Sequence, residues 1–480
     1  MIKTAAIIGG GVIGGGWAAR FLLNGINVNI FDPDPEAERK IGEVLDNARR
    51  SLPALLDNSI PNEGKLVFCD TIAEAVADAD WIQESVPERL EIKHKAFAEI
   101  QANCRKEALI GSSTSGFKPS ELQEGTANPA QIFVAHPFNP VYLLPLIELV
   151  GAAQTCARAK AALIPIGMKP LIVRQEIDAH IADRFLEAVW REALWLIKDG
   201  VATTEEIDDA IRFGFGLRWA QMGLFETYRV AGGEAGMKHF IAQFGPCLSW
   251  PWTKLMDVPD LTDELVDQIA NQSDEQSGMH TIRELERIRD DNLVTILRGL
   301  KARNWGAGET LVQHEARTKP ELPSDITKPL NTLNRVIPID WTDYNGHMNE
   351  SRYGQVFSDA GDVVMGMIGA DQAYIDSGLS YFTVENVIQY RNETHPGEKI
   401  TVMTQVLQAE GKKLRMYHEM HRANEDGTPG DLLCTCNQLL IHVSLETRRS
   451  CEPGAEMVAK MAALHEAQTK LPKPASMGEH

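Results

Sequence analysis

Short apolar runs alternate with helix-like stretches through the first 177 residues. The apolar runs have the length of strands, and they cover Thr4–Ile8, Asn27–Phe31, 79–83, 108–111, 132–135 and 171–173. Strand–helix alternation is typical of parallel sheets that are covered on both faces. The pattern therefore predicts a doubly wound α/β domain over residues 1–177.

The strand signal fades beyond this point and a helical period replaces it. Apolar residues recur at helical spacing over 181–197, and Gly200 follows as a stop signal. Thr203 and Glu206 then form the capping-box pattern that opens another helix. We expect residues 178–315 to form an all-α second domain.

Residues 316–330 have the composition of a linker, with three prolines, mixed charges and few large apolar side chains. A strand-like run at 331–341 and a helix-like stretch at 350–369 follow. Four β-rich runs come next, at 379–391, 399–408, 414–422 and 432–444. One helix combined with a series of strands predicts an α+β domain over 331–460. Residues 461–480 are expected to form a tail with a loose end.

Net charge and the lengths of the apolar stretches limit the class of protein that this chain can be. The formal net charge is −20, from 47 basic and 67 acidic residues, which argues against nucleic acid or an anionic membrane as the main partner. No stretch approaches the roughly 18 apolar residues of a membrane span. The glycine-rich start of the chain is unlike a signal peptide, so we expect a cytoplasmic protein.

Seven cysteines are scattered along the chain without a CxxC pair, so free thiols and no metal site are expected. Cys434 and Cys436 lie two residues apart on one predicted strand, and we expect them to point to opposite faces of it.

A glycine-rich turn at the end of the first predicted strand has the spacing of a dinucleotide-binding site. It is the GxGxxG motif Gly9-Gly10-Gly11-Val12-Ile13-Gly14, which opens a predicted helix. Gly9 permits the tight turn, Gly11 lets the backbone approach a pyrophosphate, and Gly14 allows close packing of helix on strand. Asp32 ends the second predicted strand, where a carboxylate accepts hydrogen bonds from the adenosine ribose and repels a 2′-phosphate. The motif predicts a Rossmann domain that binds NAD rather than NADP.

A histidine and a glutamate on neighbouring predicted strands suggest alcohol oxidation. Hydride transfer from an alcohol needs a base for the hydroxyl proton, and the pKa of histidine lies near the working pH. His136 ends a strand, which is where open α/β sheets place their active sites. Glu148 lies in the next apolar run, and a carboxylate there is costly to bury unless it is paired. The residues alone leave two interpretations open: a His136–Glu148 pair, or a structural histidine with an outward-facing glutamate.

Several longer motifs resemble the 3-hydroxyacyl-CoA dehydrogenase superfamily over residues 1–315. They are GGGVIG, ESVPERLEIK, SSTSG and AHPFNPVYLLPLIELV, together with the helical segment. The resemblance implies that His136 and Glu148 form a catalytic pair. It also implies that Ser115 is a ligand of the substrate hydroxyl and that Glu88 and Lys93 contact the nicotinamide ribose.

The chain departs from this superfamily at the start of the first long helix of the helical domain. The superfamily usually has an Asn-Arg pair there, with the Asn contacting substrate, whereas this chain has Asp183-Arg184. An amide both donates and accepts hydrogen bonds, but an ionised carboxylate only accepts them. We expect Asp183 to belong to the catalytic site and the substrate or its binding mode to differ from that of a fatty acyl-CoA enzyme.

The segment FGFGLRWAQMGLFETYRVAGGEAGM resembles a subgroup that acts on small free hydroxy acids, including bacterial L-carnitine dehydrogenases. That resemblance implies oxidation of L-carnitine to 3-dehydrocarnitine. Aromatic faces usually host a quaternary ammonium group. The available rings belong to Tyr142, Trp190, Trp219, Phe225 and Tyr228, although such rings are more often core side chains than part of a cation cage. Arg218 is a candidate for the substrate carboxylate or for a surface ion pair.

The motif DYNGHMNESRY lies at a predicted strand-to-helix junction in the C-terminal domain. The residues alone allow an ordinary Asp/Asn/Gly turn, or a site in which Asp343 acts as nucleophile or base beside a helix N-terminus. The motif resembles hotdog-fold thioesterases of the 4-hydroxybenzoyl-CoA type over 331–460. This implies a catalytic Asp343, with Gly346, His347 and Asn349 in the same motif.

Together these resemblances imply a bifunctional enzyme that uses NAD, with L-carnitine and betainyl-CoA as its small-molecule substrates, and a homodimer. The alternative is a short-chain 3-hydroxyacyl-CoA or L-gulonate-type dehydrogenase whose hotdog domain serves only for dimerisation or CoA binding.

Overall fold

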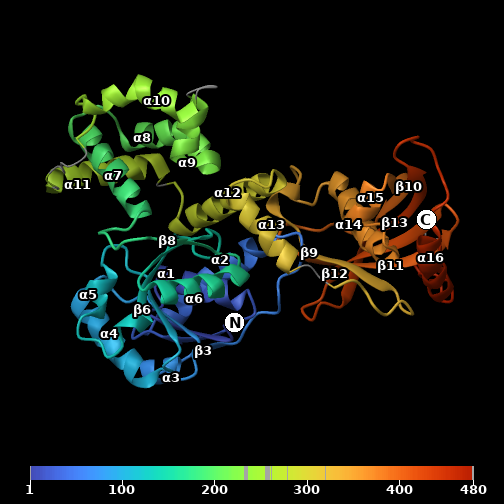
Figure 1. Cartoon of the computed structure of the whole chain (residues 1–480), viewed down its shortest axis with the longest axis horizontal. Coiled ribbons are helices and arrows are strands. Elements are labelled where there is room, and N and C mark those ends of the chain that lie inside the picture. Colours follow the sequence, from blue (N-terminus) through green and yellow to red (C-terminus); the bar gives the residue numbers. More distant parts are fainter. Residues whose placement is uncertain are drawn as a thin grey trace. The chain divides into compact units, whose positions relative to one another are not determined.

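The computed structural model describes residues 2–231, 236–254, 260, 262–277, 279–318 and 321–477. The chain forms two compact units (Figure 1). The first unit takes in Met1–Leu52 and Pro61–His314, and the second takes in Pro53–Ile60 and Glu315–His480.

The first unit contains an eight-stranded sheet in the order β3-β2-β1-β4-β5-β6-β7-β8. Its strands are β1 (Thr4–Ile8), β2 (Asn27–Phe31), β3 (Leu66–Phe68), β4 (Trp81–Glu84), β5 (Leu109–Ser112), β6 (Ile132–Pro137), β7 (Leu146–Val150) and β8 (Lys169–Ile172). The strands from β3 to β6 are parallel, which confirms the Rossmann-like arrangement.

The expectation of a parallel sheet was wrong for the last two strands. β7 pairs antiparallel with β6, and β8 is parallel to β7. The connection over 138–145 has no helix, and it is too short for the crossover of a dozen or more residues that a parallel strand needs. This hairpin-like return sets His136 directly opposite Glu148.

Helices cover both faces of this sheet. Alternate residues along each strand point to opposite faces, so both faces carry apolar side chains that a helix can bury. Ala6, Ile8 and Ile82 belong to the core on the side of α3 (Ile72–Val76), α4 (Leu90–Asn103) and α5 (Pro119–Gln123). On the other side the ring of Trp81 lies 6.0 Å from that of Trp17 on α1 (Val12–Leu22), which packs against α2 (Ala37–Ser51). The sixth helix, α6 (Ala153–Leu163), follows β7.

The rest of the first unit is helical, as the loss of strand periodicity predicted. Its helices are α7 (Ala182–Lys198), α8 (Thr204–Ala210), α9 (Gly216–Ala231), α10 (Gly236–Phe244), α11 (Asp263–Ser277), α12 (Ile282–Ala302) and α13 (Ala307–Arg317), the last of which runs on past His314. The predicted capping box opens α8, because the Glu206 amide donates to Thr203 Oγ1 and the Thr203 amide donates to the Glu206 carboxylate. Gly200, the predicted stop, follows α7 with φ of +67°.

The second unit is a five-stranded antiparallel sheet in the order β10-β13-β12-β11-β9. The strands are β9 (Leu330–Val336), β10 (Leu379–Tyr390), β11 (Lys399–Glu410), β12 (Lys413–Ala423) and β13 (Pro429–Ser444). The long helix α14 (Glu350–Ile368) packs on this sheet through side chains that include Val356 and Phe357 (Figure 1). α15 (Gln372–Asp376) and α16 (Ala455–Gln468) complete the unit, and α16 runs into the predicted tail with Leu464 buried.

The placement expected for two cysteines was wrong. Cys434 and Cys436 are both fully buried in one core with Phe357 and Met420, because residues two apart on a strand share a face. No helix within the described part of the chain has the length and the apolar run that a membrane crossing requires.

Candidate functional site

A cavity of about 730 Å³ opens beside the glycine turn that follows β1. Its wall includes Gly9 and Gly11 of the turn, Asp32 after β2, and Ser85 and Val86 after β4. These segments follow parallel strands at one edge of the sheet, the edge at which doubly wound folds bind dinucleotides. Val12 and Ile13 open α1 next to the turn, with Val12 57% exposed.

The three glycines of the motif stand in different surroundings. Gly9 has φ of +99°, and a Cβ built on it would lie 2.5 Å from the Ser85 carbonyl oxygen. A Cβ on Gly14 would lie 1.9 Å from the Gly9 carbonyl oxygen, whereas a Cβ on Gly11 would meet nothing within 4 Å. Gly9 and Gly14 thus serve the turn itself, and Gly11 leaves open space on the cavity wall.

The Asp32 carboxylate joins the glycine turn to the end of β2. Its Oδ2 accepts from the Gly10 amide at 2.5 Å, and its Oδ1 accepts from the Asp34 amide at 2.8 Å. Each carboxylate oxygen has a further lone pair, so hydrogen bonds from a ribose remain possible. The turn, the carboxylate and the cavity together fit the adenosine half of NAD.

His136 and Glu148 meet across the β6–β7 pair. His136 Nδ1 lies 3.1 Å from Glu148 Oε2, and both side chains are buried. The other carboxylate oxygen accepts from the amides of Ile181 and Ala182 at 2.9 and 3.1 Å, where α7 begins. Burial raises the pKa of Glu148, but the hydrogen bonds from His136 and from these two amides outweigh burial and hold the pKa below its usual value.

The opposite edge of the His136 ring faces α7. His136 Nε2 lies 3.4 Å from Asp183 Oδ2, so two carboxylates flank the imidazole. Burial raises the pKa of Asp183, although the nearby imidazoles oppose this. A second histidine, His180, is fully buried with its ring 5.6 Å from that of His136, and burial lowers its pKa.

The loop that carries Ser115 is linked to the end of β4. Glu88 Oε1 accepts from the Ser115 amide at 3.2 Å and from the Thr114 hydroxyl, and Glu88 Oε2 lies 3.1 Å from Lys93 Nζ. Lys93 is 1% exposed and also pairs with the buried Glu84 at 2.9 Å. The structure therefore brings Glu88, Lys93 and Ser115 together, with the Ser115 side chain exposed.

The predicted aromatic residues lie in different surroundings. Tyr142 is 3% exposed and donates its hydroxyl proton to Asp290 at 2.6 Å, in a setting where burial raises its pKa. Trp190 and Phe225 are largely exposed, as is Arg218, and Tyr228 stacks on the Phe240 ring at 4.5 Å.

Trp219 lines a cavity of about 400 Å³ with Trp305, Glu226 and Glu309. None of the residues lining this cavity belongs to the group around His136. A different aromatic ring, that of Phe138, lies 4.8 Å from the His136 ring.

In the second unit, Asp343 lies in a tight turn just before α14. Its Oδ1 accepts from the amides of Asn345 and His347 at 2.8 and 3.3 Å, and its own amide donates to the His347 carbonyl. Gly346 has φ of +79° in the same turn, and Asn349 caps α14 by accepting from the Ser351 amide at 3.0 Å. Among the described residues, Asp343 Oδ2 has no hydrogen-bond partner.

Two residues that lie beside His136 were not identified from the sequence. His180 lies in the same DAHIADR segment as Asp183, but what places it in the site is its buried ring, 5.6 Å from the ring of His136. Phe138 lies two residues after His136 in the HPFNP segment, just beyond the end of β6, and this position was a signal that could have found it.

Models of known families match most of the chain. Residues 4–176 match the model described as 3-hydroxyacyl-CoA dehydrogenase, NAD binding domain, and residues 180–269 match that of its C-terminal domain. Residues 337–461 match the thioesterase-like superfamily.

Curated relatives match both units. A protein of Ruegeria pomeroyi named L-carnitine dehydrogenase/betainyl-CoA thioesterase is 64% identical, covering 99% of each chain. A protein of Rhizobium meliloti with the same name is 50% identical over 100% of this chain and 98% of its own. A Mesorhizobium japonicum protein named L-carnitine dehydrogenase is 62% identical over 64% of this chain and 87% of its own.

A solved structure is similar over two thirds of the chain. It is titled as 5-formyl-3-hydroxy-2-methylpyridine 4-carboxylic acid 5-dehydrogenase, an NAD+-dependent dismutase. It is 25% identical with a TM-score of 0.50, covering 67% of this chain and all of its own.

Substitutions at two glycines should separate binding from folding. Gly11→Ala adds a methyl group toward the dinucleotide cavity without a clash, so the melting temperature should change little while NADH affinity falls at least about 10-fold. Gly14→Ala, the matched control, should lower both because its Cβ would overlap the Gly9 carbonyl. NADH fluorescence titration and thermal melting measure the two effects. Unchanged NADH affinity in Gly11→Ala would contradict the assignment.

Proposed function

Because the chain belongs to the 3-hydroxyacyl-CoA dehydrogenase family and carries a thioesterase-like domain on the same polypeptide, we propose that it oxidises L-carnitine to 3-dehydrocarnitine with NAD and hydrolyses betainyl-CoA to glycine betaine and CoA. The observation that carries the first activity is the buried His136–Glu148 pair at the sheet edge that also bears the glycine turn. The names of full-length relatives support the substrates.

In the proposed oxidation His136 is the base. Glu148 accepts a hydrogen bond from Nδ1–H of His136, which leaves the Nε2 lone pair to take the hydroxyl proton of the substrate. Glu148 and Asp183 then stabilise the imidazolium from its two sides. Ser115 would hold the substrate oxygen. NAD would supply the hydride acceptor; Gly9–Gly14 and Asp32 would hold its adenosine side, and Glu88 and Lys93 its nicotinamide side.

Substrate geometry constrains where the cation binds. One methylene separates the quaternary nitrogen of carnitine from the hydroxyl carbon, so these two atoms are only about 2.5 Å apart. The cation must therefore bind beside His136. Asp183 offers a carboxylate there and Phe138 an aromatic face, the two groups that suit a trimethylammonium. We assign the cation subsite to these residues, ahead of the more exposed aromatic rings on α7 and α9.

The C-terminal reaction is assigned to a hotdog fold, in which α14 packs on the antiparallel sheet. The Asp343 turn lies at the start of this helix, with Oδ1 held by two amides and Oδ2 available. Asp343 would take a proton from water as the water oxygen attacks the thioester carbonyl. The C–S bond then breaks and the CoA sulfur takes up the proton, giving CoA and glycine betaine.

We further propose a cytoplasmic homodimer. Phe185, Leu186 and Trp190 on α7 are each more than half exposed, and Val384 and Val387 on the edge strand β10 are about half exposed. Apolar side chains gathered on one helix and one sheet edge are typical of surfaces covered by a second copy.

The central test is reduction of NAD by the purified chain. L-carnitine should support it, with D-carnitine, 3-hydroxybutyryl-CoA and L-gulonate much slower, as followed by NADH absorbance. His136→Ala should lower kcat by at least about 100-fold with NADH affinity unchanged, because the base is lost but the glycine turn is not. Turnover retained by His136→Ala would refute the mechanism, and preference for another alcohol would favour the alternative dehydrogenase.

Asp183→Asn tests the cation subsite with an isosteric change. It should raise KM for L-carnitine at least about 10-fold, and more than it raises KM for 3-hydroxybutyrate, which lacks the cation. Phe138→Leu should act in the same direction. Equal losses for both substrates, confined to kcat, would instead place Asp183 in proton transfer alone.

Asp343→Asn tests the second activity. The amide cannot take a proton from water, so betainyl-CoA hydrolysis should fall at least about 100-fold while L-carnitine oxidation stays unchanged. A thiol-trapping assay for CoA measures the first rate and NADH absorbance the second. A wild-type chain that never releases CoA would favour a non-catalytic domain.

A further inference from the structure

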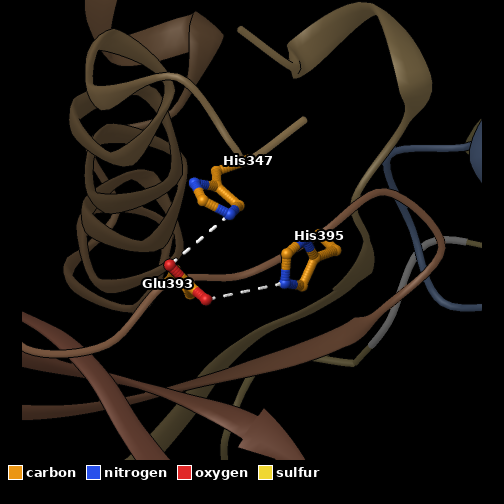
Figure 2. A group of neighbouring side chains, drawn as sticks. All are labelled: His347, Glu393 and His395. Carbon is orange, nitrogen blue, oxygen red and sulfur yellow. Dashed lines mark ion pairs between the residues drawn. The ribbon is translucent and has the colours of Figure 1, made fainter. Parts of the chain in front are cut away.

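Two loops of the second unit bring two histidines and a glutamate together. His347 lies in the turn before α14, and Glu393 and His395 lie between β10 and β11 (Figure 2). One ligand atom from each of the three side chains lies within 4.8 Å of the others. We propose that His347, Glu393 and His395 bind a divalent transition-metal ion of the zinc class.

The distances fit a shared ion with small side-chain rotations. His347 Nε2 lies 3.4 Å from Glu393 Oε2, and His395 Nε2 lies 4.0 Å from Glu393 Oε1. Zinc bonds of 2.0–2.2 Å in tetrahedral geometry separate neighbouring ligand atoms by roughly 3.4 Å. Figure 2 shows both imidazoles pointing toward the carboxylate. Two imidazoles and one carboxylate leave a fourth position for water.

The outer contacts of His395 prepare it as a ligand. Its Nδ1 lies 3.3 Å from the Gly346 carbonyl oxygen, which can only accept a hydrogen bond. This contact places the ring proton on Nδ1 and leaves the Nε2 lone pair directed at the cluster. Metal-binding histidines are usually held in this way by a carbonyl or a carboxylate.

The two loops are joined independently of any ion. The Met348 amide donates to the carbonyl of Thr394 at 2.8 Å, and Thr394 is fully buried. Glu398 accepts from the Thr394 hydroxyl and from the His395 amide. The backbone that carries the ligands is therefore already in position.

The charge around Glu393 also favours a cation. Its side-chain carboxylate is paired with the two histidines and, among the residues that the structure describes, with no Lys or Arg. The neighbouring Arg422 instead contacts the Glu398 carboxylate and the Glu393 backbone carbonyl. Within the described residues no basic side chain competes for the carboxylate.

Binding here would stabilise the turn that holds Asp343. The His347 amide donates to Asp343 Oδ1, and the Asp343 amide donates to the His347 carbonyl. An ion that ties His347 to the 393–395 loop would thus fix this turn. The binding site itself does not depend on a role for Asp343 in catalysis.

Calorimetric titration of the full-length, chelator-stripped protein with Co²⁺ tests the proposal. One saturable equivalent per chain is expected, with a visible absorption band that lacks thiolate charge transfer. His395→Ala and Glu393→Gln should each weaken binding at least about 10-fold and abolish the rise in melting temperature that Co²⁺ causes. His465→Ala removes an imidazole that pairs with Glu410 and accepts from the Ala409 amide, outside the proposed cluster; it is the matched control and should retain the site.

Two results would overturn the inference. One is the absence of saturable binding to the wild-type protein, which would make the cluster a set of ion pairs. The other is equal Co²⁺ binding by the wild type and by Glu393→Gln. This variant is isosteric, so it tests the site even if His395→Ala folds poorly. Neither result depends on thioesterase activity, so the two proposals can fail separately.

Discussion

The hydrogen bonding of the buried Glu148 carboxylate is the interaction on which the proposed dehydrogenase site depends. One of its oxygens faces His136 and the other accepts the first amides of α7. A charge in such a setting is tolerated only when it is fully hydrogen-bonded. The three N–H donors that satisfy this requirement, on His136, Ile181 and Ala182, also fix the histidine tautomer and set the start of the helix that bears Asp183. The same hydrogen bonds therefore orient the proposed base and attach the helical segment to the sheet.

That arrangement explains why the identity of residue 183 should matter for the proposed oxidation. Residue 183 lies on α7 beside the imidazole edge that Glu148 leaves open. A carboxylate on residue 183 interacts at short range with any substrate that binds against His136 Nε2. A substrate whose own positive charge is one methylene from its hydroxyl is complementary to that anion, whereas a fatty acyl chain gains nothing from it. In the proposed mechanism, specificity can thus be changed without altering the base or its partner.

Local patterns predicted the elements and much of the site, and long-range contacts account for what they missed. The first two strands, the helical segment, the capping box at Thr203 and the start of α14 follow from residue periodicity and turn chemistry. The strand β3 was missed because it has only three residues, two of them exposed. The reversal at β7 has no signature in strand propensity, only in a connection too short for a crossover. His180 and the cluster at 347, 393 and 395 could not be predicted, because their neighbours are tens of residues away along the chain.

The two cysteines on β13, Cys434 and Cys436, react with thiol reagents only when the sheet around them opens. Burial raises the pKa of Cys436 to about 12 and that of Cys434 further still, so neither forms the reactive thiolate while the strand stays in place. β13 pairs on both sides, with β10 and with β12. Alkylation of these thiols can therefore proceed only as fast as the sheet opens. The rate at which these two thiols are alkylated therefore reports the rate at which the sheet of the C-terminal unit opens.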